Sequence, residues 1–540
     1  MMSAPRLPNT PADSPRGSGP ARERPSARPG TTALVLGLGD SGLAMARWLA
    51  RDGCAVRVWD SRAQPPQAAA LAEHVPAAQV LHGRLDASAL DGVDRVYKSP
   101  GLAPTDARIA AFLGAARKAG ITSDGELALF VQALDALRIE HDYTPKVIAV
   151  TGTNGKTTTT AIAALLVEAA GRRVAAAGNI GPTMLQTLAD AIDAGPAETV
   201  LDRLPEVWVL ELSSFQLAGS EASGFEPDAA ALLNLSEDHL DWHGSFAAYG
   251  EAKARVFGSR AVIVVGAGDA AVEALVPAPK SVPVRKGRPP KSIARREVRF
   301  GNEPPRRAGD FGIVTVNDMA WLARGRDDDE WAGSDAAPTV QLLMPTDALR
   351  VRGRHNALNA LAALALATAI GCPLAPMLHA LREYRGEAHR VEYVATIDGV
   401  DAFDDSKGTN VGATVAALEG LGAERAPAKL IVILGGDGKG QDFAPLAEPL
   451  RRHARAAVTI GRDAALIEAA IAPAGLPVQR SDTLESAVQA CFASARQGDA
   501  VLLSPACASL DMFRNYGHRA EVFVAAVHAV ADARHAGSGA

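Results

Sequence analysis

The sequence predicts an α/β protein built from several domains, most simply three. Its 540 residues are too many for one hydrophobic core, so two to four domains are expected. Three regions each carry a glycine-rich turn directly after an apolar run, at 37–42, 152–157 and 434–440, within alternating strand and helix patterns. With 48% apolar and 21% charged residues, the composition is that of an ordinary globular protein.

Residues 1–30 are rich in Pro, Arg and Ser and lack the apolar segment of a secretory signal, so we expect a disordered tail. The sequence contains no run of about 20 apolar residues, which is the length needed to span a bilayer. The net charge of −6 argues against general nucleic-acid binding. The four cysteines form no C-x-x-C pair, which argues against disulfides and structural zinc and fits a reducing cytoplasm.

The first domain is expected at 31–143. An apolar run at 33–36 leads into GLGDSG, a G-x-G-x-x-G turn at 37–42 that opens a helical pattern, and Asp60 ends the next apolar run. Taken alone, this pattern suggests a Rossmann dinucleotide domain and an NAD-dependent oxidoreductase. The pattern is weak evidence for function, because such glycines also serve strand–helix packing.

The second domain is expected at 144–352. A strand at 146–150 runs into GTNGKT at 152–157, and helical spacing follows from 158. The turn is a short form of the phosphate loop, since the usual first glycine would stand at Val150. Backbone N–H groups at such a helix start bind phosphate, Lys156 can reach it, and the Thr157 hydroxyl can bind Mg²⁺.

Two polar positions follow later apolar runs of this domain. Glu211 comes after the run at 207–210 and is a candidate metal ligand at the carboxyl edge of the sheet, or else a helix cap. His239 lies between two aspartates after the run at 229–235, where metal or substrate contact and a structural role are equally reasonable. The charged stretch 281–337 and the stretch 187–205 are expected to be surface elaborations.

The third domain is expected at 353–540. It opens with HNALN at 355–359 and an apolar helix, and apolar runs at 429–434 and 500–504 predict strands. The chain as a whole resembles the Mur ligase family, the ATP-dependent amide ligases of peptidoglycan precursor synthesis. The segments that carry the resemblance are GTNGKTTT (152–159), GNIG (178–181), ELSSFQL (211–217), NLSEDHLD (234–241), HNALN (355–359), HR (389–390), DDSKGTN (404–410) and GGDGK (435–439).

The resemblance implies a Rossmann-like first domain, a P-loop ATPase-like second domain and a Rossmann-like third domain. The stretches at 37–42, 405–410 and 504–516 (SPACASLDMFRNY) are most similar to members that add D-glutamate to UDP-N-acetylmuramoyl-L-alanine (UDP-MurNAc-L-Ala). The DNPR motif of diaminopimelate-adding members is absent. The implied partners are these two substrates and ATP, in a cytoplasmic monomer with two Mg²⁺ ions, and no nucleic acid or membrane.

The resemblance also assigns residues to each ligand. The UDP-substrate would contact Gly39, Asp40, Ser41, Asp60, Ser61, Arg62 and Asn179. ATP would contact Gly152, Thr153, Asn154, Gly155, Lys156, Thr157, Thr158, Asn356, Asn359, Arg390, Asp405 and Lys407, with His389 beside the phosphates. D-Glutamate would contact Thr409, Lys439, Ser509 and Tyr516, the last replacing the commoner phenylalanine.

The implied catalytic residues are Lys156, His239, Lys253, Glu211 and Asn179, and the implied metal ligands are Thr157, Glu211, His239 and Lys253. Local sequence alone favours a solvent-exposed helical lysine at 253, whereas the family carries a carbamylated lysine there. The alternatives to a D-glutamate ligase are a folylpolyglutamate-type or diaminopimelate-type ligase, the NAD-dependent oxidoreductase and a nonenzymatic nucleotide switch.

Overall fold

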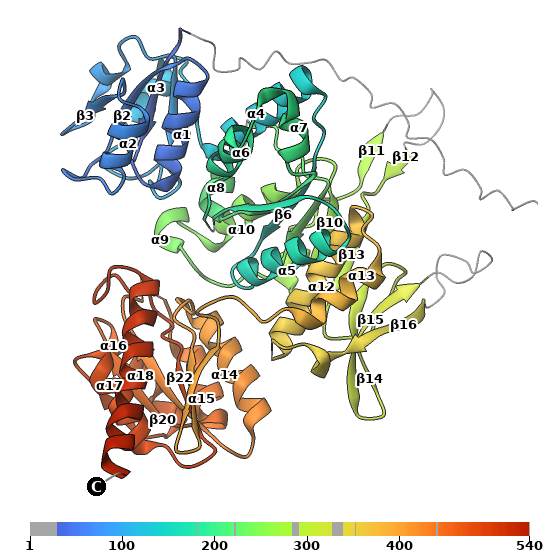
Figure 1. The fold of residues 1–540 in the computed structure, drawn as a ribbon, viewed down its shortest axis with the longest axis vertical. Helices are drawn as coiled ribbons and strands as arrows, with labels where there is room; N and C mark the ends of the chain where they lie inside the picture. The colour runs from blue at the N-terminus through green and yellow to red at the C-terminus, as the bar shows by residue number, and fades with distance from the viewer. Residues whose placement is uncertain are drawn as a thin grey trace, which may run out of the picture.

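The computed structural model describes residues 30–179, 181–220, 223–282, 291–326, 338–351, 353–438 and 441–538. Most of the predicted disordered tail therefore lies outside the described residues. Three large sheets, each with its own helices, form three bodies that follow one another along the chain (Figure 1). Among the described residues, no helix combines the length and apolarity needed to cross a membrane.

The N-terminal sheet is fully parallel, with the strand order β3-β2-β1-β4-β5. Its elements are β1 (Thr32–Leu36), α1 (Asp40–Arg51), β2 (Ala55–Trp59), α2 (Ala68–His74), β3 (Gln79–Leu81), η1 (Ala87–Leu90), β4 (Arg95–Lys98), α3 (Ala110–Lys118), β5 (Ser123–Asp124) and α4 (Glu126–His141). The glycine turn is required sterically, because a Cβ on Gly42 would lie 2.0 Å from the Gly37 carbonyl oxygen. The turn thus lets α1 start directly against β1.

The middle sheet has nine strands in the order β16-β15-β14-β13-β10-β9-β6-β8-β7, antiparallel only at its β14–β16 end. Its strands are β6 (Lys146–Thr151), β7 (Val174–Gly178), β8 (Val207–Glu211), β9 (Ala229–Leu232), β10 (Val262–Gly266), β13 (Glu297–Phe300), β14 (Phe311–Val316), β15 (Met319–Arg326) and β16 (Thr339–Pro345). A separate hairpin joins β11 (Lys280–Val282) and β12 (Lys291–Ile293).

The helices of the middle domain cover its sheet, so that the central strands are buried. They are α5 (Lys156–Ala169), α6 (Met184–Asp193), η2 (Ala197–Thr199), α7 (Val200–Arg203), α8 (Ser214–Ala218), α9 (Leu240–His243), α10 (Phe246–Ala254), η3 (Arg255–Phe257), α11 (Ala270–Glu273) and η4 (Thr346–Ala348). Both strand faces are covered, which is why the parallel strands read as continuous apolar runs in the sequence.

Two stretches that were expected to be surface elaborations contribute strands or helices to the folded middle domain. Within 281–337, strands β13, β14 and β15 extend the middle sheet, and Val298, Phe311 and Leu322 lie in its core. The charged side chains that suggested a solvated excursion alternate with these buried ones. Within 187–205, α6 and α7 pack Leu188 and other apolar side chains against the sheet. The surface prediction was therefore wrong for the described parts of both stretches, whereas residues 283–290 and 327–337 lie outside the described residues.

The domain boundary expected at 352/353 would assign two helices to the third domain, although they cover the sheet of the middle domain. Helices α12 (Arg354–Ala369) and α13 (Leu374–Glu383) both pack on α5, and α12 also contacts β9, β10 and β13. The apolar side chains of α12 are buried in the middle-domain core, as its composition predicted. We therefore propose that the C-terminal domain begins near β17 (Glu392–Ile397).

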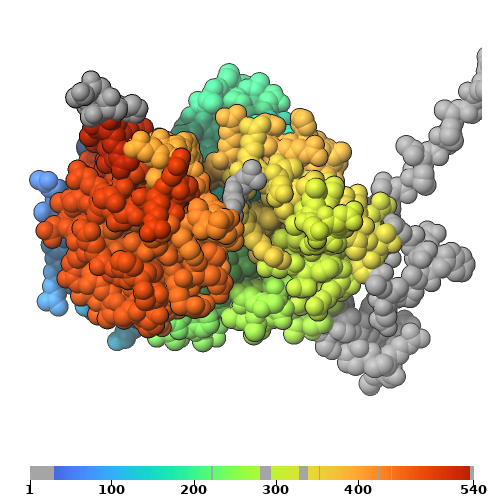
Figure 2. All heavy atoms as spheres, turned by 90° about the horizontal axis from the view of Figure 1, so that it is seen from below, coloured from blue at the N-terminus to red at the C-terminus, as the bar shows by residue number. Residues whose placement is uncertain are grey.

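The C-terminal sheet has the order β17-β18-β22-β19-β20-β21 and is parallel except for the edge strand β17. Its other elements are β18 (Val400–Asp404), α14 (Val411–Arg425), β19 (Leu430–Gly435), η5 (Ala444–Leu446), α15 (Ala447–His453), β20 (Ala454–Ile460), α16 (Ala464–Ile471), η6 (Ala472–Ala474), β21 (Val478–Arg480), α17 (Leu484–Ser494), β22 (Ala500–Leu503) and α18 (Tyr516–Ser538). Figure 2 shows this domain beside the middle domain, with a hollow between them.

Candidate active site

The phosphate-loop motif lies between β6 and α5, which confirms the predicted strand–loop–helix arrangement. Asn154 N–H donates to Asn234 Oδ1 at 2.8 Å, and Asn234 Nδ2 donates back to the Asn154 carbonyl at 3.0 Å. Gly155 has φ +81°, and a Cβ there would lie 2.4 Å from Asn359 Oδ1. The loop is thus held from two sides, and α12 approaches it closely.

The buried Lys253 and the half-buried Lys156 meet at one carbonyl of this loop. Lys156 Nζ donates to the carbonyls of Gly152 at 3.0 Å and Thr153 at 2.7 Å, and Lys253 Nζ donates to Gly152 at 2.6 Å. Lys253 is only 1% exposed and lies 4.7 Å from the centre of the Tyr249 ring. The solvent-lysine interpretation of Lys253 is therefore wrong.

Burial sets the proton affinity of both amines. It lowers the pKa of Lys253 well below its ordinary value, and the neighbouring Lys156 ammonium lowers it further. Burial also lowers the pKa of Lys156, against the opposing influence of Glu211 and Asp238. The lowered pKa favours the neutral Lys253 amine more than the pKa of a surface lysine would.

Glu211 ends β8 as a buried carboxylate, 1% exposed. Its Oε1 accepts from Asn179 Nδ2 at 2.8 Å, whereas its Oε2 is buried without a hydrogen-bond partner. The alternative of a helix cap is wrong, because Ser213 caps the next helix together with Gln216. A buried carboxylate oxygen without a donor is costly, so the site fits a cation that would ligate it.

His239 precedes the short helix α9 in the left-handed conformation, with φ +54°. Its Nε2 lies 3.4 Å from Asp238 Oδ2, and its ring packs 4.6 Å from Phe215. Tyr249 lies between His239 and Lys253, since the two aromatic rings are 6.5 Å apart and the Tyr249 ring also contacts Lys253. A left-handed histidine is a strained conformation of the kind that functional sites retain.

A cavity of about 490 Å³ lies between the middle and C-terminal domains. Of the residues assigned to ATP from the sequence, the following line it: Asn154, Gly155, Thr158, Asn356, Asn359, Arg390 and Asp405. Gly152, Thr153, Lys156, Thr157 and Lys407 do not line it. Thr157, at 4% exposure, lies buried at the start of α5. Asn410, which sequence reasoning left without a role, donates from Nδ2 to Asn154 Oδ1 across the two domains at 3.1 Å.

The C-terminal wall of this cavity holds buried charged groups. Burial raises the pKa of Asp405 to about 7, although its Oδ2 accepts from Ser504 Oγ at 2.6 Å. Arg390 has a buried Nε without a hydrogen-bond partner. His389 Nδ1 lies 2.7 Å from Asp404 Oδ2. These groups bring a cation and carboxylates to the side of the cavity opposite the phosphate loop.

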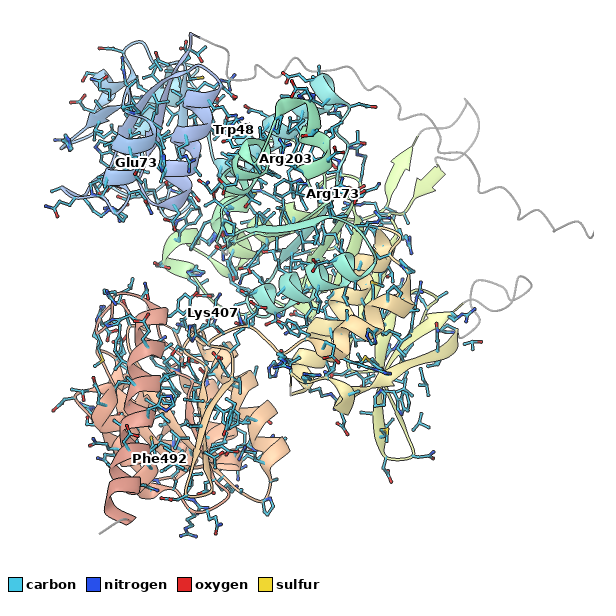
Figure 3. The ribbon with its side chains drawn as sticks, viewed as in Figure 1. Trp48, Glu73, Arg173, Arg203, Lys407 and Phe492 are labelled. Carbon is cyan, nitrogen blue, oxygen red and sulfur yellow. The ribbon has the colours of Figure 1, made fainter. Side chains whose placement is uncertain are left out.

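Of the residues assigned to D-glutamate, Thr409 and Ser509 lie on loops that follow strands of the C-terminal sheet, and Tyr516 begins α18. Lys407 lies 5.3 Å from the Tyr516 ring centre, and Figure 3 places Lys407 at the edge that faces the middle domain. Ser509 is buried and Tyr516 is 38% exposed. Thr409 follows on the Lys407 loop, where its N–H donates to the Lys407 carbonyl. Lys439 lies outside the described residues.

The buried Arg519 of α18 joins the two loops that carry these residues. Its Nη2 donates to the Ser406 carbonyl at 2.7 Å and its Nη1 to the Cys507 carbonyl at 3.2 Å. Burial lowers the pKa of Arg519 to about 10. Nothing in the local sequence singled out this arginine, because its function depends on two loops brought together only by the fold.

A second cavity, of about 460 Å³, lies at the carboxyl edge of the N-terminal sheet. Six residues assigned to the UDP-substrate line it: Gly39, Asp40, Ser41, Asp60, Ser61 and Arg62. Asn179 does not; it lies beside Glu211. Arg62 hydrogen bonds lower the pKa of Asp60 to about 2, and Ser41 Oγ donates to the buried Glu126 at 2.7 Å. Ser99 and Arg108 also line the cavity and were not predicted.

Comparison with known proteins identifies the family to which this chain belongs. The chain belongs to the Mur ligase family, a class of ATP-dependent ligases, because family models match it in all three domains. They are the Mur ligase MurD-like N-terminal domain at 31–122, the Mur ligase middle domain at 150–285 and the Mur ligase glutamate ligase domain at 389–507. The family resemblance and its three-domain architecture are confirmed.

Two relatives within the family show which of its members this chain is similar to. The chain is 56% identical to the UDP-N-acetylmuramoylalanine–D-glutamate ligase of Albidiferax ferrireducens, over 93% of this chain and 96% of that protein. It is 54% identical to the enzyme of the same name from Burkholderia pseudomallei, over 92% of this chain and 97% of that protein. The oxidoreductase and the nonenzymatic switch do not fit this membership.

Solved structures support the fold independently of close sequence similarity. The UDP-N-acetylmuramate–alanine ligase MurC of Thermotoga maritima matches with a TM-score of 0.53 at 20% identity, covering 92% of this chain and 99% of that chain. The MurF ligase of Thermotoga maritima, in complex with ADP, matches with a TM-score of 0.53 at 16% identity, covering 93% of this chain and 96% of that chain.

Proposed function

We propose that this chain is an ATP-dependent amide ligase that joins D-glutamate to UDP-MurNAc-L-Ala, releasing ADP and phosphate in peptidoglycan precursor synthesis. The observation that carries the proposal is the buried Lys253 and Glu211 beside Lys156 of the phosphate loop, in a chain 54–56% identical to D-glutamate ligases. We further propose a cytoplasmic monomer, because the four cysteines are free, as in a reducing compartment, and one chain lines both cavities.

The reaction has two chemical steps. The substrate carboxylate attacks the γ-phosphorus of ATP; a P–O bond forms, the bond to the bridging oxygen breaks and ADP leaves. The amine of D-glutamate then attacks the acyl carbon, forming a tetrahedral intermediate that expels phosphate and loses the amine proton to solvent. Phosphoryl transfer needs positive charge on the transferring oxygens, which Lys156 supplies once it turns from the loop carbonyls to the phosphates.

The donor set fits Mg²⁺, the cation that ATP chemistry requires. Glu211 Oε2, buried without a partner, and the Thr157 hydroxyl would hold one ion, and His239 with a carbamylated Lys253 would hold the second. Bound there, Mg²⁺ neutralises phosphate charge. Asn179 supports this arrangement by fixing the other Glu211 oxygen.

Carbamylation of Lys253 follows from its surroundings. The neutral amine attacks CO₂, so an N–C bond forms, one C–O π pair moves to oxygen, and a proton leaves the nitrogen. An ammonium cannot do this, and burial beside Lys156 favours the neutral amine. Carbamylated Lys253 is an anion with two oxygen atoms that can ligate Mg²⁺, whereas a Lys253 ammonium would be repelled by the metal ion.

The two cavities and the loops divide the substrates among them. UDP-MurNAc-L-Ala would bind Gly39, Asp40, Ser41, Asp60, Ser61 and Arg62 with its nucleotide. ATP would bind the phosphate loop together with Asn356, Asn359, Arg390, Asp405 and Lys407, and D-glutamate would bind Thr409, Lys439, Ser509 and Tyr516. The ammonium and hydroxyl groups of the last set suit the two carboxylates of glutamate.

Amino-acid omission tests the proposal directly. We expect phosphate release from ATP and UDP-MurNAc-L-Ala with D-glutamate, and at least about tenfold less with L-glutamate or diaminopimelate, since an ill-placed carboxylate leaves buried polar groups unpaired. Product mass gives the amide formed. Equal release with another amino acid would instead favour a folylpolyglutamate-type or diaminopimelate-type ligase.

Domain closure on ATP is a second expected outcome. The ATP residues are divided between the middle domain and loops near the start of the C-terminal domain, so binding at both walls draws the walls together. Small-angle X-ray scattering should show a smaller radius of gyration with a nonhydrolysable ATP analogue and UDP-MurNAc-L-Ala. AMP, which lacks the β- and γ-phosphates, serves as the control. An unchanged radius with the ATP analogue would mean a permanently closed arrangement.

A further inference from the structure

Lys98 lies where β4 ends, beside the N-terminal cavity, and its contacts leave its charge without an anionic partner. Its Nζ donates to the Leu102 carbonyl at 2.5 Å and to the Ser99 carbonyl at 3.3 Å. Ser99 and Leu102 form part of the cavity wall, whereas Lys98 itself lies behind it. Among the described residues, no carboxylate lies within ion-pair distance of Lys98.

Trp242 faces Lys98 from the middle domain. The Lys98 ammonium lies 5.7 Å from the Trp242 ring centre, and Trp242 Nε1 is buried without a hydrogen-bond acceptor. Burial lowers the pKa of Lys98 to about 8, so the amine remains partly charged near neutral pH. A buried indole N–H without an acceptor costs free energy that a bound acceptor oxygen would recover.

The position of this pair links the two substrate sites. Trp242 is on α9, which begins immediately after His239. Figure 1 shows α9 projecting from the middle domain into the space between the N-terminal and C-terminal domains. A substrate whose nucleotide occupies the N-terminal cavity and whose carboxylate reaches the His239 region would therefore extend toward the contact between Lys98 and Trp242.

We propose that Lys98 and Trp242 form a subsite for the part of the nucleotide substrate that lies between its diphosphate and its reacting carboxylate. The ligand atoms are uncharged acceptor oxygens, the hydroxyl and amide carbonyl oxygens of an N-acylated sugar and its acyl chain. The diphosphate is the less suitable ligand, because the glycine turn and the start of α1 already offer it N–H groups inside the cavity. The inference rests on the proposed function.

The test compares Lys98→Met and Trp242→Phe, with Lys118→Met on the exposed end of α3 as the matched control. Trp242→Phe removes the N–H and keeps an aromatic ring. For each full-length variant, the KM of UDP-MurNAc-L-Ala, ATP and D-glutamate is measured, together with inhibition by UDP alone. We expect about a five- to tenfold higher KM for UDP-MurNAc-L-Ala in both variants. The other constants and the control should stay within about twofold, within the range of a neutral surface substitution.

Two results would overturn the subsite. One is an unchanged KM for UDP-MurNAc-L-Ala in both variants. The other is an equal loss of affinity for free UDP, which would make Lys98 a support of the cavity wall. Calorimetric titration with UDP-MurNAc-L-Ala gives the same comparison without turnover, and melting temperatures report whether each variant is folded. A wild-type enzyme that binds this nucleotide but releases no phosphate with D-glutamate would contradict the proposed function and leave the binding comparison intact.

Discussion

Replacing Lys253 by methionine is expected to lower kcat by about 1,000-fold, because the proposed second metal site would lose its anionic ligand and with it several kcal/mol of transition-state stabilisation. Binding of the ATP analogue should change little, since the phosphate loop keeps its glycines and Lys156. Methionine has a similar length and suits a site where the lysine is 1% exposed, so the variant should fold. Steady-state kinetics and calorimetry with the ATP analogue measure the two effects separately.

The control for this variant is Lys146→Met, at the opposite end of β6, where the lysine side chain is 43% exposed and pairs with Asp228. It should retain full kcat. Carbamylation itself is visible without turnover, as a carbamate carbon resonance after equilibration with ¹³C-bicarbonate that is present in the wild type and absent from Lys253→Met. Full activity of Lys253→Met, or a wild type without the resonance, would disprove this role.

Replacing Glu211 by glutamine is expected to lower kcat by about 100-fold or more, because an amide nitrogen takes the place of the oxygen that has no donor. The change keeps the shape of the side chain, and an amide oxygen can still accept from Asn179. Removing an uncompensated buried charge should leave the melting temperature equal or higher. Mn²⁺ binding, followed by electron paramagnetic resonance, should weaken in parallel with kcat.

Glu206→Gln provides the matched comparison, since Glu206 is an exposed partner of Arg173 just before β8. It should retain both activity and Mn²⁺ affinity. If Glu211→Gln bound Mn²⁺ as the wild type does, the unpartnered oxygen would have no connection with a metal. If Glu211→Gln failed to fold, the carboxylate would instead be a structural element of the sheet edge.

The positions where apolar strands meet glycine turns were predictable, because their cause is local. A Cβ at Gly42 or Gly155 would collide with neighbouring atoms, so the sequence must place glycine there. The carboxylate at the end of β8 was predictable for the same reason, since the chain direction of parallel strands brings it to the edge that binds ligands.

Other features depend on residues far apart in the chain. The burial of Lys253 is decided by the phosphate loop, 101 residues earlier, to whose Gly152 carbonyl it donates. Strands β13 to β15 were missed because β13 and β15 carry Glu297 and arginines among their buried side chains, and the charged segments beside them made the region read as surface. Whether an alternating segment pairs with a sheet is set by the neighbouring strand, and no local pattern contains that information.

The packing of α12 on the middle sheet affects the order in which contacts to ATP would form. In the proposed domain closure, Asn356 and Asn359 on α12 would stay with the phosphate loop, whereas Asp405 and the Lys407 loop would move with the C-terminal domain. ATP can therefore associate with the open enzyme through contacts on one domain alone and acquire the remaining contacts afterwards. Its association rate should be independent of the domain movement, while its residence time should lengthen once the enzyme has closed. Nucleotide capture and nucleotide retention thus depend on different residues.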